Sequence, residues 1–314
     1  MTIPAFLEVV EAKTKLASIL PCLIGLGFSL AYFHQLNGLN SLLFFVALLC
    51  IDMATTAINN LMDYQHAVSD DYREHTNVLG RRQVAPKTVL NLIVTLLFAA
   101  LVIGLVLVWR TQWVLFFIGG FCVLIGIFYT SGPLPLNRLP LGEVFSGVTM
   151  GFGIPFLMVF VNVLPQSFVA VTWQWPNLFV SGSWVALVTL ILVCVMPMGT
   201  IANVMLANNL CDLKEDEANH RTTLPMYLTH GQAMWLYASL AYGGFVAILI
   251  AVALGLLHWP ALLVFVALPL VWRNTQQFLA LQDKAKTFKT ALLSLLAENI
   301  ALILALLIDW GLSR

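Results

Sequence analysis

The chain has 314 residues, of which 60% are hydrophobic and 10% are charged, and its mean hydropathy is +0.91. A water-soluble chain of this length exposes far more charge, so the composition excludes a soluble globular protein and indicates an integral membrane protein. Its 15 basic and 15 acidic residues balance, which excludes the strongly basic surface typical of nucleic-acid-binding proteins.

Apolar runs long enough to cross about 30 Å of hydrocarbon predict nine transmembrane helices. In chain order they cover residues 16–34, 40–62, 88–109, 112–129, 141–163, 183–210, 231–257, 259–272 and 290–310. The eighth is the shortest. We therefore expect an all-α, polytopic membrane protein with a single domain over residues 1–314.

The lysines and arginines predict how these helices are oriented. With nine helices, thirteen of these residues lie on the side of the N-terminus, and only Arg110 and Arg314 lie on the other. Cytoplasmic loops are enriched in Lys and Arg, so the N-terminus is expected in the cytoplasm and the C-terminus outside the cell membrane. The uncharged, aromatic-rich loop 164–182 is expected to cap the outer interface.

A short polar motif occurs twice, at the ends of the second and sixth expected helices. The first copy is Asn59-Asn60-Leu61-Met62-Asp63 and the second is Asn208-Asn209-Leu210-Cys211-Asp212, with one residue changed in five. Residues four apart lie on one face of a helix, so Asn208, Asp212 and Asp216 form a strip of oxygen ligands. One such strip is most simply a solvated helix end, but the duplication favours a site shared between repeated units.

The polar loops that follow the two motifs add charges of both signs. Mg²⁺ is usually bound by one or two carboxylates together with substrate phosphate oxygens, and Arg and Lys bind the remaining phosphate charge. The motifs therefore predict a metal–diphosphate site, with Arg81 and Arg221 at similar distances after their aspartates. Other basic residues are attributed to the topological excess of positive charge or to contact with anionic lipids, namely Arg73, Lys284, Lys286 and Lys289.

Other polar residues near the motifs stay open between a structural and a functional role. Intramembrane carboxylates are costly and usually paired or functional, which makes Glu143 and Asp52 candidates. Asp52 lies about two turns above Asn59 and is expected to face the same side. His66 and His220 are weaker candidates beside the site.

At these residues the sequence resembles the UbiA superfamily of membrane prenyltransferases, which carry Asn-x-x-x-Asp after helix two and Asp-x-x-x-Asp after helix six. Within that superfamily it is most similar to the 1,4-dihydroxy-2-naphthoate prenyltransferases of menaquinone synthesis. The segments that carry this resemblance are Lys13-Thr14-Lys15, Tyr129–Pro135, Leu141–Phe145, Asn208–Asp212 and Thr222–Pro225.

The resemblance implies a nine-helix bundle around a central cavity, with polar loops and a cavity mouth on the cytoplasmic side and Mg²⁺ as cofactor. It implies an aromatic face near the allylic carbocation, for which Tyr129 and Tyr64 are the candidates, and that Asp63, Asp212 and Asp216 are catalytic. The implied metal ligands are Asp63, Asp70, Asp212 and Asp216. The implied substrate-binding residues are Asn59, Asn208, Lys15, Arg81, Arg221 and Lys214.

The first motif departs from the family pattern. Asn60 stands where an Asp is expected, Ala67 replaces a Gly, and Asp70 and Asp71 come slightly out of register. These differences leave the third ligand of the first metal site open.

The expected reaction transfers a polyprenyl group from its diphosphate to 1,4-dihydroxy-2-naphthoate, with loss of the carboxylate as CO₂, and yields demethylmenaquinone. The expected partners are these two substrates and the lipid bilayer, without nucleic acid. One alternative keeps the chemistry with another acceptor, such as 4-hydroxybenzoate, a chlorophyllide, haem or a glycerol lipid. A transporter of an anion and a structural scaffold are the alternatives from other classes. The sequence does not set the prenyl chain length or the oligomeric state.

Overall fold

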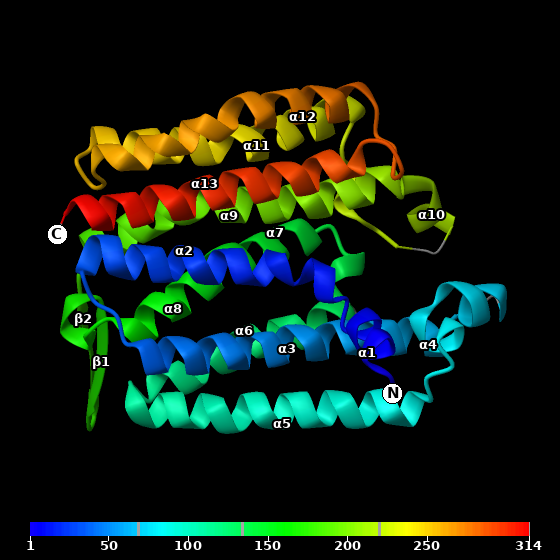
Figure 1. The fold of residues 1–314 in the computed structure, drawn as a ribbon, viewed down its shortest axis with the longest axis horizontal. Coiled ribbons are helices and arrows are strands. Elements are labelled where there is room, and N and C mark those ends of the chain that lie inside the picture. Colours follow the sequence, from blue (N-terminus) through cyan, green and yellow to red (C-terminus); the bar gives the residue numbers. More distant parts are fainter. Residues whose placement is uncertain (68–69, 133–134, 219–220, 314) are drawn as a thin grey trace. The chain divides into compact units, whose positions relative to one another are not determined.

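The computed structural model describes residues 1–67, 70–132, 135–218 and 221–313, and these are mainly helical (Figure 1). The chain divides into two compact units. Unit 1 consists of Met1–Ile19 and Leu42–Pro135, and unit 2 consists of Leu20–Ser41 and Leu136–Arg314. The single domain over residues 1–314 stays a prediction.

Unit 1 packs short helices against longer apolar ones. Its elements are α1 (Ile3–Val9), η1 (Ala12–Lys15), the start of α2 (Leu16–Phe33), most of α3 (Gly38–Gln65), η2 (Tyr72–Thr76), α4 (Val78–Arg81), α5 (Pro86–Arg110) and α6 (Val114–Thr130). Val9, Ala57, Leu79 and Val89 form a buried cluster that joins α1, α3, α4 and α5. This cluster holds the chain on both sides of the first polar motif.

Unit 2 is organised around α9 (Trp184–Cys211), beside which α13 runs in Figure 1. Its other elements are η3 (Leu136–Arg138), α7 (Gly142–Ser146), η4 (Gly147–Gly153), α8 (Ile154–Asn162), η5 (Pro165–Ser167), β1 (Val169–Gln174), β2 (Asn177–Gly182), α10 (Leu213–Ala218), η6 (Leu224–Tyr227), α11 (His230–Ala253), η7 (Trp259–Ala267), α12 (Leu268–Ala280) and α13 (Phe288–Leu312).

Glycines let the neighbouring helices approach α9 closely. A Cβ added at Gly151 of η4 would lie 2.4 Å from the Met198 nitrogen, and one added at Gly244 of α11 would lie 2.7 Å from the Met196 Cα. Small residues at such crossings are how membrane helices gain packing contact without a hydrophobic driving force. The close packing fixes α9, whose last turn carries the second polar motif.

Seven helical spans among the described residues are long and apolar enough to cross a membrane: Ala12–Phe33, Gly38–Gln65, Pro86–Arg110, Gly142–Asn162, Trp184–Cys211, His230–Ala253 and Phe288–Leu312. These seven candidate spans agree with the expected multi-pass membrane architecture. The expected fourth helix is present as α6, with 17 residues, and the expected eighth is divided between η7 and α12. The count of nine crossings and the cytoplasmic placement of the loops stay predictions.

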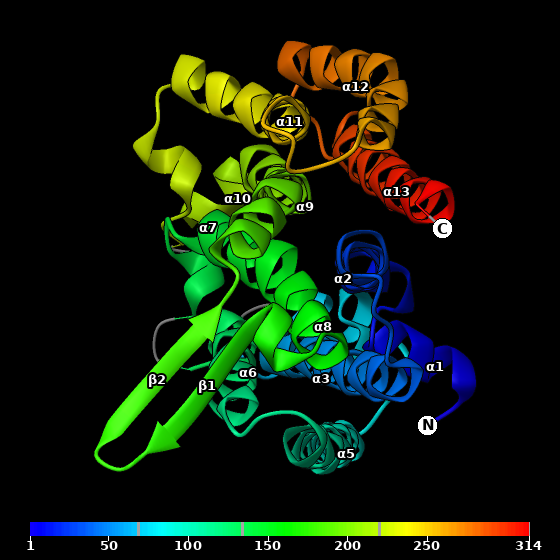
Figure 2. The same ribbon diagram turned by 90° about the vertical axis from the view of Figure 1, so that its left-hand side faces the viewer.

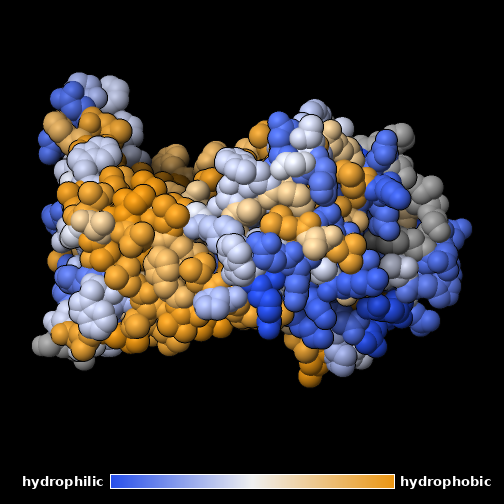
Figure 3. Space-filling model, turned by 90° about the horizontal axis from the view of Figure 1, so that it is seen from above, coloured by the Kyte–Doolittle hydropathy of each residue, from blue (hydrophilic) through white to orange (hydrophobic). Residues whose placement is uncertain are grey.

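Apolar and polar side chains gather in different places on the face seen in Figure 3. Large apolar areas cover much of this face, and polar side chains are concentrated toward its right-hand end. Apolar exposure of this kind suits a hydrocarbon environment, whereas on a soluble protein it marks an interaction site.

The expected loop 164–182 contains a β-hairpin, so the all-α prediction needs a correction there. β1 and β2 pair antiparallel with Val169 opposite Gly182 and Trp173 opposite Leu178, and Figure 2 shows the two strands side by side. Alternating β-branched and aromatic residues favour strands. The long apolar runs on either side obscured this short period-two pattern.

Candidate active site

The second polar motif lies in unit 2, where α9 ends and α10 begins. The Asp212 N–H donates to the Asn208 carbonyl over 3.0 Å, and the Asp216 N–H donates to the Asp212 carbonyl over 2.8 Å. Helical spacing therefore continues across the break between the two helices and keeps Asn208, Asp212 and Asp216 four residues apart on one side. These three residues are called the polar strip below.

Lys284 is the residue of this site that the sequence interpretation missed. Its ammonium donates to the Asn208 amide oxygen and, over 2.5 Å, to Asp212 Oδ2. The side chains of Asn208 and Asp212 thus converge on one cation, as ligands of a metal ion must. Lys284 comes from the segment between α12 and α13, and no local pattern distinguishes it from Lys286 or Lys289. Its attribution to topological charge alone was wrong.

Asp216 is the buried member of the polar strip, with a side chain 6% exposed. Arg221 Nη1 lies 3.5 Å from its Oδ1, and the Thr223 hydroxyl donates to its Oδ2 over 3.4 Å. Burial raises the pKa of the Asp216 carboxyl, and the positive charge of Arg221 partly offsets that effect. The structure therefore brings together the predicted pair Asp216 and Arg221. Lys214 lies exposed on α10, and His220 falls outside the described residues.

A buried carboxyl lies directly behind the motif. Glu143 of α7 is 3% exposed, and its Oε1 accepts a hydrogen bond from the Asn209 amide over 2.8 Å. Glu143 Oε2 has no hydrogen-bond partner among the described residues. The Asn209 side chain thus points away from the polar strip and connects α9 to α7. Asn208 contributes to the polar strip, whereas Asn209 contributes to helix packing.

The first polar motif lies in unit 1, in the last turns of α3. Asn59 and Asp63 are partly buried there. The Asn60 amide donates to the Val9 carbonyl over 2.9 Å, and the Asn60 carbonyl accepts from the Asn77 amide over 3.1 Å. A carboxylate cannot donate a hydrogen bond, so an Asp at position 60 could not make the contact with Val9. This contact gives a physical reason for the departure from the family pattern.

Lys15 is buried beside the same helix. Its ammonium donates to Asp52 Oδ1 over 2.6 Å, to the Asp52 carbonyl over 3.1 Å and to the Thr56 hydroxyl over 2.7 Å. Asp52, Thr56, Asn59 and Asp63 follow spacings of four, three and four, which place them on one face of α3. The structure thus puts Lys15 on the face of α3 that carries the first motif, with its three N–H groups engaged.

The remaining predicted residues of unit 1 form surface ion pairs. Arg81 Nη2 lies 3.0 Å from Glu8 Oε2, and Arg82 also pairs with Glu8. The hydrogen bond from Arg82, which is the largest influence, lowers the pKa of Glu8 to about 2. Asp70 is exposed and lies 3.1 Å from Arg73.

The aromatic segment of the resemblance is only partly described. Tyr129 is partly buried in the last turns of α6. Pro133 and Leu134 of the same segment fall outside the described residues.

The donor set of the site suits a hard cation that its substrate helps to bind. Within the described ranges, no group of three or more His, Cys, Asp or Glu side chains is arranged to hold a metal ion. Mg²⁺ does not require such a cage, because it keeps waters and takes substrate phosphate oxygens beside one or two carboxylates. Carboxylate and amide oxygens that already share the Lys284 cation fit that pattern.

Comparison with known proteins identifies the family. The model of the UbiA prenyltransferase family matches residues 18–297. A 1,4-dihydroxy-2-naphthoate octaprenyltransferase of Bacillus subtilis (strain 168) is 27% identical over 239 residues, which cover 74% of this chain and 68% of that protein. The protein of the same name from Mycobacterium leprae (strain TN) is 26% identical, over 73% of this chain and 70% of its own length.

Solved structures show the same fold at lower identity. The apo structure of a UbiA homologue from Aeropyrum pernix K1 has a TM-score of 0.67 at 14% identity, covering 93% of this chain and 98% of that one. A UbiA homologue from Archaeoglobus fulgidus, bound to DMAPP and Mg²⁺, has a TM-score of 0.58 at 11% identity, covering 95% and 98%. Since the family model spans most of its length, the chain belongs to the UbiA prenyltransferase family of enzymes.

Proposed function

We propose that this prenyltransferase transfers a polyprenyl group from polyprenyl diphosphate to 1,4-dihydroxy-2-naphthoate, with release of diphosphate and CO₂. The observation that carries the proposal is the convergence of the Asn208 and Asp212 side chains on one cation. The names of the two bacterial relatives support the choice of acceptor. So does the segment from Leu141 to Phe145, which places the buried Glu143 behind the second motif.

Mg²⁺ fits the second motif, where Asp212 and Asp216 would hold it, and Asp63 and Asp70 of the first motif remain predicted ligands. When bound, the metal supplies Lewis-acid stabilisation of the negative charge on the departing diphosphate. Lys284 and Arg221 lie beside these carboxylates and supply positive charge for phosphate oxygens. Lys214, Arg81, Lys15 and the amides of Asn59 and Asn208 remain predicted substrate contacts.

The reaction at the acceptor ring needs no base to remove a ring proton, because CO₂ leaves from the attacked carbon instead. The bond between the prenyl carbon and the diphosphate oxygen breaks, and an electron-rich ring carbon attacks the allylic cation, which needs aromatic faces such as Tyr129 and exclusion of water. The bond from that ring carbon to the carboxyl group then breaks, CO₂ leaves, and the electron pair restores the aromatic ring. The immediate product is the quinol of demethylmenaquinone.

A transporter is the alternative from another class, but its sites usually lie near the midplane of the membrane. Both polar motifs lie at the ends of long helices, α3 and α9. That placement agrees better with an enzyme that binds a diphosphate group at the membrane surface.

Carboxyl-labelled acceptors test the proposal directly. The purified protein receives farnesyl diphosphate, Mg²⁺ and either carboxyl-labelled 1,4-dihydroxy-2-naphthoate or carboxyl-labelled 4-hydroxybenzoate. We expect one labelled CO₂ per prenyl group transferred to the naphthoate, and no reaction with Asp212→Asn. Retention of the label in a prenylated benzoate, with the naphthoate inert, would keep the family and reject the acceptor.

A further inference from the structure

A cavity lies in unit 2, at the opposite end of α9 from the polar strip. Its volume is about 240 Å³, and it is lined by residues of α2, the start of α9, the segment after α11 and the end of α13. Val185 lines it near the first residue of α9, whereas Asp212 follows the last. The 28 residues of α9 extend about 42 Å at 1.5 Å per residue, which is the thickness of a bilayer with its headgroups. The cavity is therefore separate from the metal–diphosphate chemistry.

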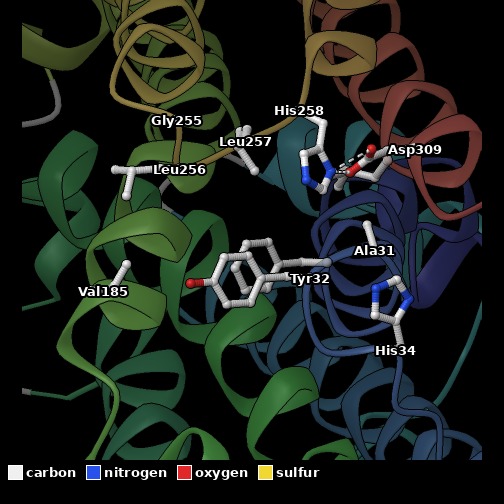
Figure 4. A pocket seen from close by; sticks show the side chains of 11 residues that line it. Ala31, Tyr32, His34, Val185, Gly255, Leu256, Leu257, His258 and Asp309 are labelled. Atoms are coloured by element: carbon white, nitrogen blue, oxygen red, sulfur yellow. Dashed lines mark hydrogen bonds and ion pairs between the residues drawn. The ribbon is translucent and has the colours of Figure 1, made fainter. Parts of the chain in front are cut away.

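A paired imidazole and carboxylate form the polar side of this cavity (Figure 4). His258 Nδ1 lies 3.0 Å from Asp309 Oδ1 and 3.3 Å from Oδ2. The Asp309 side chain is 10% exposed and the His258 side chain 69%. Because a carboxylate only accepts, Nδ1 donates this hydrogen bond, and Nε2 lies outside the contact with Asp309. Figure 4 shows this second nitrogen turned away from Asp309.

Stacked aromatic rings form another side. The rings of Phe28 and Tyr32 lie 5.0 Å apart and are inclined by 12°. Phe28 is fully buried, and Tyr32 is partly exposed and lines the cavity. Figure 4 shows the Tyr32 ring opposite the segment that carries Leu257 and His258. A planar ring between these sides gains both stacking and a directional hydrogen bond.

We propose that this cavity binds the hydroxylated aromatic headgroup of a prenylated quinol, the class of lipid that the proposed reaction releases. The inference rests on the proposed function for the identity of that lipid. The ring stacks on Tyr32, and one ring hydroxyl donates to Nε2 of His258, whose imidazole Asp309 orients. The prenyl tail leaves past Val185, which is 55% exposed, into the hydrocarbon.

The volume of the cavity and the charge of Asp309 favour a neutral ring headgroup over phosphate and ammonium headgroups. Pockets that enclose a whole drug-sized ligand usually measure about 300–1,000 Å³, so the cavity suits a ring headgroup whose tail stays outside. An anionic phosphate headgroup would meet the Asp309 carboxylate. An ammonium headgroup would need that carboxylate, which His258 already engages. A neutral ring with hydroxyl groups is not repelled by Asp309 and does not need its carboxylate as a counter-ion.

The experiment measures binding of a 1,4-naphthoquinol with one isoprenyl unit to the full chain in nanodiscs under anaerobic conditions. His258→Asn retains a nitrogen that can donate to Asp309 but lacks Nε2, and Val185→Trp narrows the mouth without touching the polar pair. We expect each variant to raise the Kd at least tenfold. His230→Asn, an exposed histidine at the start of α11, and the inactive Asp212→Asn should bind as the wild type does.

The outcomes separate the cavity from the reaction. Wild-type affinity in both His258→Asn and Val185→Trp, or loss of binding in Asp212→Asn, would overturn the site, since the probe would then occupy another place. Absence of saturable binding by the wild type would overturn it as well. If the enzyme prenylates a different acceptor while binding still depends on His258, the proposed acceptor fails and the quinol site stands.

Discussion

The Lys284 ammonium can compete with a metal ion for the Asp212 carboxylate. Its ammonium contacts both Asn208 and Asp212, and its side chain is 47% exposed. An exposed pair of this kind is worth about 0.2–1 kcal/mol, so a divalent ion can displace it at low cost. The contact identifies the oxygens available to the metal better than the spacing of the motif does.

Replacing Lys284 should therefore strengthen metal binding in the absence of substrate. We expect Lys284→Gln to lower the Kd for Mn²⁺, used as a spectroscopic substitute for Mg²⁺, by about two- to fivefold, which corresponds to the energy of an exposed ion pair. Titration of the substrate-free protein followed by electron paramagnetic resonance measures this effect. Lys286→Gln in the same segment is the matched control and should change nothing. Equal Kd values for both variants would mean that the metal does not use the oxygens beside Lys284.

Asp212 should be indispensable for turnover. Asp212→Asn keeps the shape of the side chain and removes the charge of a metal ligand, so we expect kcat to fall at least about 100-fold at saturating Mg²⁺, in line with the loss of one transition-state-stabilising group. Glu217→Gln, an exposed acid on α10, controls for a change in local charge. Near-normal turnover by Asp212→Asn would remove the second motif from the site.

At the scale of the element, Lys15 links η1 to the middle of α3. The Lys15 and Asp52 side chains are 7% and 17% exposed, and the Ser18 hydroxyl also donates to Asp52 over 2.5 Å. Removing one partner of a buried pair leaves an uncompensated charge at a cost of about 3–5 kcal/mol.

We therefore expect Lys15→Met to lower the thermal unfolding midpoint in detergent by several degrees, and Lys15→Met/Asp52→Asn to recover part of the loss. The measurement is unfolding followed by circular dichroism. If Lys15→Met leaves the midpoint unchanged and instead raises KM for prenyl diphosphate, the ammonium serves the substrate, as the resemblance implies.

The elements that local pattern determines could be predicted from the sequence. The long apolar runs gave the seven spanning helices within a few residues, because hydrocarbon thickness sets their length. The spacing of Asn208, Asp212 and Asp216 gave the polar strip. The hairpin 169–182, the division between η7 and α12, and the contacts Lys284–Asp212 and Asn209–Glu143 could not be predicted. The two contacts depend on packing between segments far apart in the chain, which composition and periodicity do not encode. The hairpin and the division between η7 and α12 are local, but the long apolar runs obscured them.

At the scale of the whole molecule, the number of crossings decides on which side each loop lies. Thirteen of the 15 basic residues share one side only if the segment η7–α12 crosses the membrane. Its two parts together cover Trp259–Ala280, which is long enough to span, but neither part does so alone. Within unit 2 the segment runs the length of α9, because His258 before η7 lies beside Val185 and Lys284 after α12 contacts Asp212. Nine crossings put Lys284 and the polar strip in the cytoplasm and the end of α13 outside, and the reversed orientation would exchange these two sides.

Single-cysteine labelling of intact cells distinguishes these topologies in a variant whose five native cysteines are replaced by serine or alanine. We expect a membrane-impermeant maleimide to label Trp175→Cys in the hairpin and Ser313→Cys after α13. Lys214→Cys and Lys286→Cys should react only after permeabilisation, because nine crossings put them in the cytoplasm with the polar strip. Labelling of Lys214→Cys and Lys286→Cys in intact cells, with Trp175→Cys and Ser313→Cys protected, would show the reversed orientation. Because Lys284 contacts Asp212, that result would also place the polar strip outside the cytoplasm.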